Sequence, residues 1–301
     1  MRPLLIHPGL HKTATSWLQA VPFADRAIFN SLMSHQEVDA AFVRPHDWVW
    51  QPSTARKVIE ERRAQNDTAD VDVISSEILT GNPFFGSKDV PTFVERLNRT
   101  IPNAKILLTV REQSQWLRSL YQQFVKRGGQ LSLEDFLSGH AEPQYAGFDF
   151  ISLEFHRFAD EFAAAFGEAN VVVLPQELLR KDMDAFFSQL SDFLSVAAIS
   201  PKPAWHRAVG ASPPRGSDWL LRMANALQDK PLSRSSNKRL AMIGKQLERL
   251  AYRLPSRGNA PIIPMPKTRI RRSNAKLQRY CPVDLSEYGY QIDSAEGRPG
   301  N

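Results

Sequence analysis

The sequence predicts an α/β protein with a three-layer core, in which a mostly parallel central sheet carries helices on both faces. Short apolar or β-branched runs alternate along the chain with longer segments whose apolar residues recur every three or four positions. The run at 171–174, Val-Val-Val-Leu, is apolar throughout, as is typical of a strand that is buried on both faces of a parallel sheet. Strands that alternate with crossover helices form such a sheet.

The first 200 residues contain the elements of this sheet in order. Strands are expected at 4–6, 27–30, 72–75, 105–110 and 171–174. Helices are expected after the first strand and at 53–66, 88–100, 112–126, 150–166 and 183–194. Ser53 or Thr54 is the candidate cap of the helix at 53–66, and Gly128-Gly129 follow the helix at 112–126.

Beyond residue 200 the pattern changes, because prolines interrupt it repeatedly. Helices are expected at 217–228 and 238–254. We therefore expect one domain over 1–301, with an α/β core at 1–200, a helical or irregular lid or appendage at 201–293, and a disordered tail at 294–301.

The composition is that of a globular protein, and its formal net charge of +6 suits a negatively charged ligand. The chain shows no nucleic-acid-binding motif, so we expect no nucleic acid as a partner. Its single cysteine, Cys281, allows no intrachain disulfide and fits a reducing compartment. No apolar stretch is long enough for a signal peptide or a bilayer span, and we expect a cytoplasmic protein without an integral membrane segment.

The first strand is followed by a pattern that is typical of a phosphate-binding loop. The apolar run at 4–6 ends at Pro8-Gly9, and a helix-like stretch begins a few residues later. Between them stand a lysine and three hydroxyl residues, Lys12, Thr13, Thr15 and Ser16. The backbone N–H groups of such a turn, together with a lysine side chain, bind anions.

This loop differs from the P-loop of nucleotide hydrolases, which reads Gly-x-x-x-x-Gly-Lys-Ser/Thr. Only Leu10 and His11 separate Gly9 from Lys12, and His11 stands where the P-loop has its second glycine. A nucleotide kinase or NTPase with a degenerate P-loop remains an alternative, and so does a non-catalytic nucleotide-binding protein.

A second candidate anion site follows the strand at 105–110. Arg111 stands at the carboxyl end of this strand, where ligands bind in open α/β sheets. Ser119 and Tyr121 come about two turns later in the helix that follows. A guanidinium and a hydroxyl group can hold a phosphate by charge-assisted hydrogen bonds.

Together the two segments resemble the sulfotransferases that use 3′-phosphoadenosine 5′-phosphosulfate (PAPS). The 5′-phosphosulfate loop of that family reads roughly Lys-[Ser/Thr]-Gly-Thr-[Thr/Ser], and residues 12–16 match it except at Ala14. The family's 3′-phosphate site is an Arg at a strand end, a Ser eight residues on and often a Tyr two beyond, which Arg111, Ser119 and Tyr121 match. The resemblance implies a P-loop NTPase-like sulfotransferase fold of a bacterial or carbohydrate-type member. It also implies PAPS as donor, adenosine 3′,5′-bisphosphate as product and no required metal.

The resemblance further implies roles for single residues. Lys12 would stabilise the oxygen that leaves the sulfur, and the backbone N–H groups of residues 13–16 would hold the phosphosulfate. Trp17 aligns with a position that stacks on adenine in some members, and it fits a core position of the helix equally well. Ala14 replaces a glycine, which matters if this position needs a positive φ.

A base must take the acceptor's proton, and Glu77 is the first candidate. It comes just after the strand at 72–75, at the sheet edge that is expected to carry Lys12 and Arg111. A structural role, as an ion pair with one of these cations or as a helix cap, is the alternative. His11 is the second candidate, although a histidine in a turn is more often structural, and His206 in the lid is the third.

We expect the acceptor to be a small molecule or a carbohydrate that offers a hydroxyl or an amine group. The segment at 267–272, Lys-Thr-Arg-Ile-Arg-Arg, is a basic run. Such a run is either solvated surface or, in this protein, a contact for the 3′-phosphate or an acidic acceptor.

Overall fold

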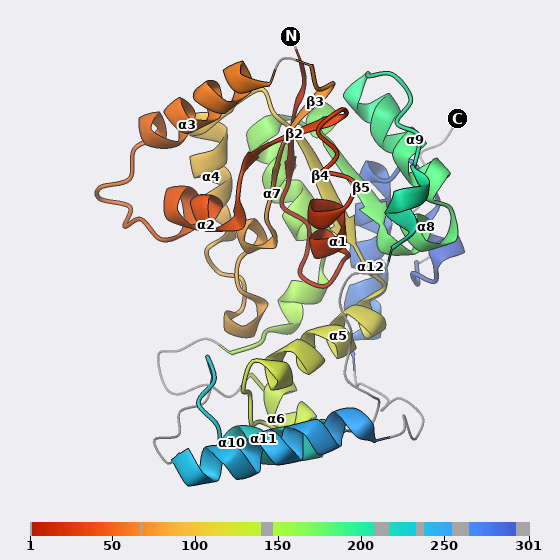
Figure 1. Cartoon of the computed structure of the whole chain (residues 1–301). Coiled ribbons are helices and arrows are strands. Elements are labelled where there is room, and N and C mark those ends of the chain that lie inside the picture. Colours follow the sequence, from red (N-terminus) through yellow and green to blue (C-terminus); the bar gives the residue numbers. More distant parts are fainter. Residues whose placement is uncertain are drawn as a thin grey trace.

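The computed structural model describes residues 2–66, 68–139, 147–207, 217–232, 238–254 and 265–292. Its centre is a sheet of five parallel strands in the order β2-β3-β1-β4-β5 (Figure 1). The strands are β1 (Leu4–His7), β2 (Phe29–Met33), β3 (Val71–Ser75), β4 (Lys105–Val110) and β5 (Val171–Pro175). The predicted parallel α/β sheet is therefore confirmed.

Strand β1 lies at the centre of the sheet, between β3 and β4. Leu5 is paired with Val73 of β3 and with Lys105 of β4. The chain builds β2 and β3 on one side of β1 and then crosses to build β4 and β5 on the other. Because all strands are parallel, the loops that follow β1, β3 and β4 leave the same edge of the sheet, and the reversal of strand order beside β1 is where such folds bind ligands.

Helices cover both faces of the sheet, and neighbouring residues of one strand belong to different cores. Leu5 packs in the core with α1 (Thr15–Ala20), α8 (Gln176–Lys181) and α9 (Met183–Leu194). Ile6 packs in the opposite core with α3 (Pro52–Gln65), α4 (Val90–Thr100) and α7 (His156–Phe166). This alternation follows from the strand's two-residue side-chain period, and it confirms the predicted three-layer arrangement.

Helix α5 (Gln113–Lys126) connects the sheet edge with the C-terminal helices. The Glu112 carboxylate caps it by accepting hydrogen bonds from the backbone N–H groups of Ser114 and Gln115, at 2.9 and 3.1 Å. At the other end, the N–H of Gly129 donates to the carbonyl of Phe124 at 2.9 Å. Both ends of the helix agree with the prediction within one residue, because the residues that start and end it are its neighbours in the sequence.

Several other boundaries differ from the prediction. Helix α3 begins at Pro52 with Gln51 as its cap residue, and not at Ser53 or Thr54, because proline is preorganised for the first helical turn. The segment predicted as one helix at 150–166 is a 3₁₀ turn, Phe150–Leu153, followed by α7. Four short helices were not predicted: α2 (His35–Val38), a π-helix (Asp39–Val43), α6 (Leu133–Leu137) and α8. Further 3₁₀ turns lie at Glu77–Thr80, Pro83–Phe85, Glu168–Asn170, Pro203–His206, Gln278–Tyr280 and Leu285–Tyr288.

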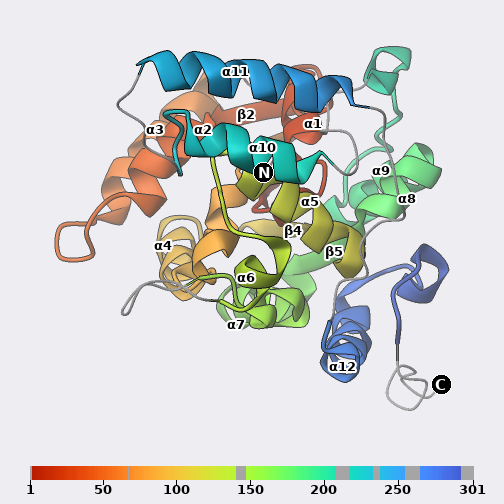
Figure 2. The ribbon, with the colours of Figure 1, turned by 90° about the horizontal axis from the view of Figure 1, so that it is seen from below.

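The described part of the C-terminal third is mainly helical, as predicted. Helices α10 (Asp218–Ala226) and α11 (Lys238–Arg253) pack against each other and lie beneath α5 (Figures 1 and 2). Asn225 joins α10 to the end of α5, because its Nδ2 donates to the carbonyls of Val125 at 2.7 Å and Gly129 at 3.0 Å. The predicted tail at 294–301 lies outside the described residues.

The basic run at 267–272 forms the first half of α12 (Lys267–Leu277), a helix that was not predicted. Helix α12 packs against α7. Arg269 Nε donates to Glu154 at 2.8 Å, and the Ser273 hydroxyl lies 2.8 Å from His156 Nδ1. Arg269 of the basic run therefore forms an ion pair with Glu154 within the fold. Within the described ranges, no helix is both long and apolar enough to cross a membrane.

Candidate active site

The loop after β1 has an unusual backbone. Gly9, Lys12 and Ala14 adopt positive φ values of 50°, 67° and 67°. A Cβ atom at Gly9 would lie 2.7 Å from Thr15 Oγ1 and 2.9 Å from His7 Nε2, so the loop is also tightly packed at its start. Ala14 occupies the position where the resembling family has glycine, and it adopts the left-handed conformation that glycine adopts most readily. Ala14 therefore does adopt the positive φ that the sequence analysis considered for this position.

Buried hydrogen bonds hold this loop from below. The Thr13 hydroxyl donates to the carbonyl of Leu10 and lies 2.8 Å from Thr109 Oγ1 of β4. Thr109 Oγ1 is also 3.0 Å from His7 Nε2, and His7 Nδ1 is 2.8 Å from Ser75 Oγ of β3. The loop is thereby tied to the three central strands of the sheet, and Thr13 faces this network.

The upper side of the loop presents unpaired donors. Among the described residues, the backbone N–H groups of Lys12 to Ser16 have no hydrogen-bond acceptor. The buried Thr15 hydroxyl also lacks a partner. Unpaired N–H groups are costly unless an anion or water accepts their hydrogen bonds. With the Lys12 ammonium beside them, they form a site that suits a sulfate or phosphate group.

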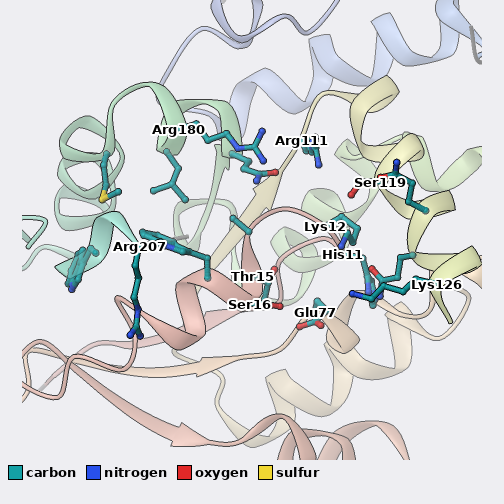
Figure 3. A pocket seen from close by; sticks show the side chains of 18 of the residues that line it. His11, Lys12, Thr15, Ser16, Glu77, Arg111, Ser119, Lys126, Arg180 and Arg207 are labelled. Atoms are coloured by element: carbon teal, nitrogen blue, oxygen red, sulfur yellow. The ribbon is translucent and has the colours of Figure 1, made fainter. Parts of the chain in front are cut away.

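A cavity of about 930 Å³ opens at this edge of the sheet (Figure 3). Lys12 stands near the centre of the view in Figure 3, with Arg111 and Glu77 on opposite sides of it. Lys12 comes from the loop after β1, Glu77 from the turn after β3, and Arg111 from the end of β4. These residues are far apart in sequence, and the parallel strand order brings them together.

Arg111 is half-buried and keeps an unpaired Nε. Its Nη2 makes a long contact of 3.4 Å to Gln115 Oε1. Burial lowers the pKa of Arg111, and the neighbouring Arg180 lowers it further, while Glu177 opposes the shift. Ser119, which lies further along in α5, lines the same cavity. Arg111 therefore has donors available for an anion.

Arg180 joins Arg111 from helix α8. The side-chain amide of Gln176 is oriented so that both its oxygen and its nitrogen have partners. Gln176 Oε1 accepts from Arg180 Nη2 at 3.1 Å, and Gln176 Nε2 donates to the carbonyl of Lys12 at 3.3 Å. Gln176 thus connects the second arginine to the lysine loop. Figure 3 shows the side chains of Arg180 and Arg111 directed toward the same part of the cavity.

Positive charge dominates the cavity. Among the described residues, its lining contains six cations and one carboxylate, that of Glu77; the cations are Lys12, Arg111, Lys126, Arg127, Arg180 and Arg207. Burial lowers the pKa of Lys12, and the charges of Lys126 and Arg111 lower it further, while Glu77 opposes the shift. Such crowding of like charges predicts that the cavity binds a polyanion.

Glu77 and His11 stand on the side of Lys12 that faces away from Arg180. Glu77 begins the 3₁₀ turn after β3, lines the cavity, and has a buried Oε2 without a hydrogen-bond partner in the described part of the chain. His11 Nε2 donates to the carbonyl of Gly81 at 2.9 Å. Burial lowers the pKa of His11, and the Glu77 charge opposes this shift. The free carboxylate oxygen of Glu77 is therefore better placed to take a proton than the bonded Nε2 of His11.

The comparison with protein families agrees with this geometry. Residues 49–145 match the model of the sulfotransferase domain, and this range contains Glu77, Arg111 and Ser119. Over these residues the chain is similar to the sulfotransferase family. None of the curated proteins compared with the chain matches its sequence.

Several solved structures are similar to this chain. A sulfotransferase from Alicyclobacillus acidocaldarius has a TM-score of 0.49 and 16% identity, over 85% of this chain and 98% of that one. The sulfotransferase domain from the curacin biosynthetic pathway has a TM-score of 0.41 and 15% identity, over 84% and 99% of the two chains. The mouse sulfotransferase SULT7A1, in complex with PAP, has a TM-score of 0.38 and 16% identity, over 80% and 74%.

Most of the residues singled out from the sequence meet in the cavity. The lining includes all three candidate bases, Glu77, His11 and His206, and two candidates for the 3′-phosphate, Arg111 and Ser119. It also includes the loop residues Lys12, Ala14, Thr15, Ser16 and Trp17. The Trp17 Nε1 donates to the carbonyl of Arg207 at 3.0 Å, so its ring is fixed at the cavity wall and is not wholly in the core.

Thr13 and Tyr121 do not line the cavity. Thr13 is buried under the loop, so only its backbone N–H remains available for a ligand. The Tyr121 ring packs against Phe124 and Phe136, with centroids 6.3 and 5.6 Å away, and its hydroxyl donates to the carbonyl of Leu131 at 3.0 Å. Tyr121 therefore belongs to the aromatic core beside α5, where its hydroxyl has a partner, and the structure does not bring it to the cavity with Arg111 and Ser119.

The sequence analysis missed four cations of the lining: Lys126, Arg127, Arg180 and Arg207. Lys126 lies seven residues after Ser119 in α5, and a spacing of seven puts two residues on the same side of a helix. This spacing could have identified Lys126 from the sequence. Arg180 lies in α8, a helix that the sequence analysis did not predict, so no signal near a strand end marked it. Among the described residues, no cluster of His, Cys, Asp and Glu side chains could hold a metal ion.

Proposed function

We propose that this chain transfers the sulfuryl group of PAPS to a hydroxyl or amine group of a small-molecule or carbohydrate acceptor. The observation that carries the proposal is the convergence of Lys12 and Arg111 on one cavity from adjacent strands of the sheet. The two residues mark two separate groups of unpaired donors. PAPS carries two separate anionic groups on one nucleoside, which is the ligand pattern that two such cradles would match.

The residues present fit this donor. The unpaired N–H groups of the lysine loop and the orphaned Thr15 hydroxyl would hold the 5′-phosphosulfate. Arg111, Ser119 and Arg180 would hold the 3′-phosphate, with the planar guanidinium groups as the strongest partners. Arg180 would do so from α8, an element that the sequence did not reveal.

The adenine would lie against the apolar part of the wall. The cavity lining includes four apolar residues from α1, α8, α9 and the 3₁₀ turn Pro203–His206, namely Trp17, Leu179, Met183 and Trp205. A tryptophan ring offers a flat apolar surface for stacking, and its N–H is already bonded to the backbone of Arg207. A volume of about 930 Å³ lies near the top of the range of roughly 300–1,000 Å³ that is usual for ligand sites, which leaves room for an acceptor.

When bound, PAPS supplies a sulfuryl group that is activated by its bond to the phosphate. Glu77 Oε2 would take the proton of the acceptor hydroxyl while the acceptor oxygen forms its bond to sulfur. The bond between sulfur and the bridging oxygen breaks, and the Lys12 ammonium would neutralise the charge that develops on that oxygen. By analogy with phosphoryl transfer, positioning and charge neutralisation supply most of the rate.

A binding comparison tests the donor. Calorimetry should show that adenosine 3′,5′-bisphosphate binds more tightly than adenosine 5′-monophosphate, and that Arg111→Met removes this preference for the 3′-phosphate. Tighter binding of ATP with Mg²⁺ than of the bisphosphate would support a kinase or NTPase instead. Lys57→Met is the matched control, because Lys57 is 79% exposed on α3 and does not line the cavity.

A transfer assay tests the chemistry. With ³⁵S-labelled PAPS and a panel of small hydroxyl, amine and saccharide acceptors, labelled product should form with the wild-type protein and not with Lys12→Met. Nucleotide binding without transfer to any acceptor of the panel would support a non-catalytic nucleotide-binding protein. The cytoplasmic location expected from the sequence stays a prediction.

A further inference from the structure

The cavity continues along helix α5 beyond the residues that the donor needs. Ser119, Gln122, Gln123 and Lys126 line it at steps of three and four residues, and Arg127 follows directly after the helix. Residues at these steps share one face of a helix, and the rise from Ser119 to Lys126 is about 10 Å. This face is too long to serve one phosphate group only, so its far end is available for a second ligand.

The far end of this face carries two cations without a carboxylate partner. Neither Lys126 nor Arg127 forms an ion pair with any described residue, and both side chains are exposed to the cavity. The opposite face of α5, with Trp116, Leu117 and Leu120, is buried in the core. The positive charge on the cavity side is therefore not required to hold the helix in place.

These cations lie on the side of the cavity where the acceptor would enter. Figure 3 shows Lys126 and Glu77 on one side of Lys12, whereas Arg180 and Arg207 lie on the other. The charge of Lys126 lowers the pKa of Lys12, and that of Arg127 lowers the pKa of His11, so both cations are close to the reacting end of the lysine loop. The apolar residues proposed to contact the adenine come from elements other than α5.

We infer that Lys126 and Arg127 form an anion subsite for the acceptor, and that the acceptor is an acidic saccharide or a similar molecule with a carboxylate or ester sulfate near its reacting hydroxyl. The inference rests on the proposed function and names the substrate class of the same site. Gln122 and Gln123 stand between this subsite and Ser119, where their amides can bond to neutral hydroxyl groups. One face of α5 thus carries amides that can bind hydroxyl groups and cations that can bind an anionic group.

Binding to the protein saturated with adenosine 3′,5′-bisphosphate tests the subsite. The probe is a hexasaccharide of alternating glucuronate and N-acetylglucosamine, and its carboxyl-reduced derivative is the matched neutral ligand. By calorimetry, the acidic hexasaccharide should bind at least about tenfold more tightly than the reduced one, since hydrogen bonds to charged groups are the strong ones. Lys126→Gln and Arg127→Gln should each remove most of this difference, and Lys57→Gln should leave it unchanged.

Chemical labelling separates the subsite from the donor site. With acetic anhydride and mass spectrometry, the acidic hexasaccharide should protect Lys126, and the bisphosphate alone should protect Lys12 but not Lys126. Equal affinity for the two saccharides, no binding of either, or protection of Lys126 by the bisphosphate alone would overturn the inference.

The two proposals fail in different ways. If the bisphosphate does not bind, the proposed donor is wrong. The saccharide comparison, repeated without nucleotide, still decides whether Lys126 and Arg127 select an anionic ligand. If the bisphosphate binds and Lys126→Gln weakens its binding as strongly as Arg111→Met, the two cations belong to the donor site and the acceptor subsite is wrong.

Discussion

His7 Nε2 lies 3.0 Å from Thr109 Oγ1, and this hydroxyl lies 2.8 Å from the hydroxyl of Thr13. A buried histidine of the central strand is thus connected, through its neighbour strand, to the loop that carries Lys12. His7 is fully buried, and burial lowers its pKa to about 3. It is therefore neutral in the folded protein at all ordinary pH values, and its ring can both donate and accept in this network.

Stability should fall on acidification because of His7. Its folded-state pKa of about 3 lies below the value of 6.5 for an exposed histidine, so between these values the unfolded chain binds a proton that the folded protein does not. Stability is then complete above pH 6.5 and declines as the pH falls toward 3, by about 1.4 kcal/mol per pH unit for one proton. Urea unfolding at pH 7.5, 6.5 and 5.5 measures this slope, which should be shallower by about one proton in His7→Asn. If His7→Asn does not fold, the ring signals of His7 followed by NMR decide the matter, and a titration above pH 5 would contradict the expectation.

Removing the Lys12 ammonium should strongly slow catalysis while the fold stays intact. The Lys12 side chain is exposed to the cavity, and its backbone already adopts a positive φ that Met must adopt as well. We expect Lys12→Met to lower kcat by about 100- to 1,000-fold, as the loss of one charge-stabilising donor does in other enzymes. The measurement is sulfate transfer at saturating donor, together with a melting curve. A variant that turns over within tenfold of wild type would exclude Lys12 from charge stabilisation.

Arg111 and Arg180 should bind the 3′-phosphate together. Each single change to Met should weaken adenosine 3′,5′-bisphosphate by about 10- to 100-fold, because each removes a charge-assisted hydrogen bond. Since the two guanidinium groups repel each other without ligand, the double variant should lose less than the sum of the single losses. Calorimetry on the four proteins gives the coupling. Strict additivity would mean that the two arginines do not share one anion.

Glu77→Gln should depress turnover without changing nucleotide affinity. The glutamine keeps the size of the side chain but cannot take a proton, so kcat should fall by about 100-fold or more. Glu77→Asp should retain part of the activity, since it keeps the carboxylate at a slightly greater distance. An unchanged kcat in Glu77→Gln would transfer the role of base to a histidine, with His11 as the next residue to change.

Ala14→Gly should be neutral or stabilising, in contrast to the usual effect of glycine. At φ 67° a non-glycine residue costs about 1–2 kcal/mol, whereas the extra freedom of glycine in the unfolded chain costs about 0.4–1 kcal/mol. The matched control is Ala164→Gly, an exposed residue of α7, which should lose about 1 kcal/mol. Urea unfolding compares the free energies of unfolding. A loss in Ala14→Gly equal to that in Ala164→Gly would show that Ala14 carries no strain.

The sequence predicted the helices and strands correctly where neighbouring residues define their ends. Strand β4 and helix α9 have the predicted bounds, because apolar period and flanking residues define both ends. The short helices α2, α6 and α8 were missed because four to six residues hold too little of a helical period to be recognised. Helix α12 was missed because its first half is basic, and only the structure reveals that Arg269 is paired with Glu154.

The sequence by itself determined the two anion motifs at Lys12 and Arg111, since the residue types and the turn that each needs are neighbours along the chain. It could not determine that Lys126 and Arg180 join them, because these cations come from the end of α5 and from α8. Their meeting depends on the strand order, which sets β4 between β1 and β5. Strand order and helix packing result from burying one sheet between two helical layers, and this burial depends on contacts along the whole chain.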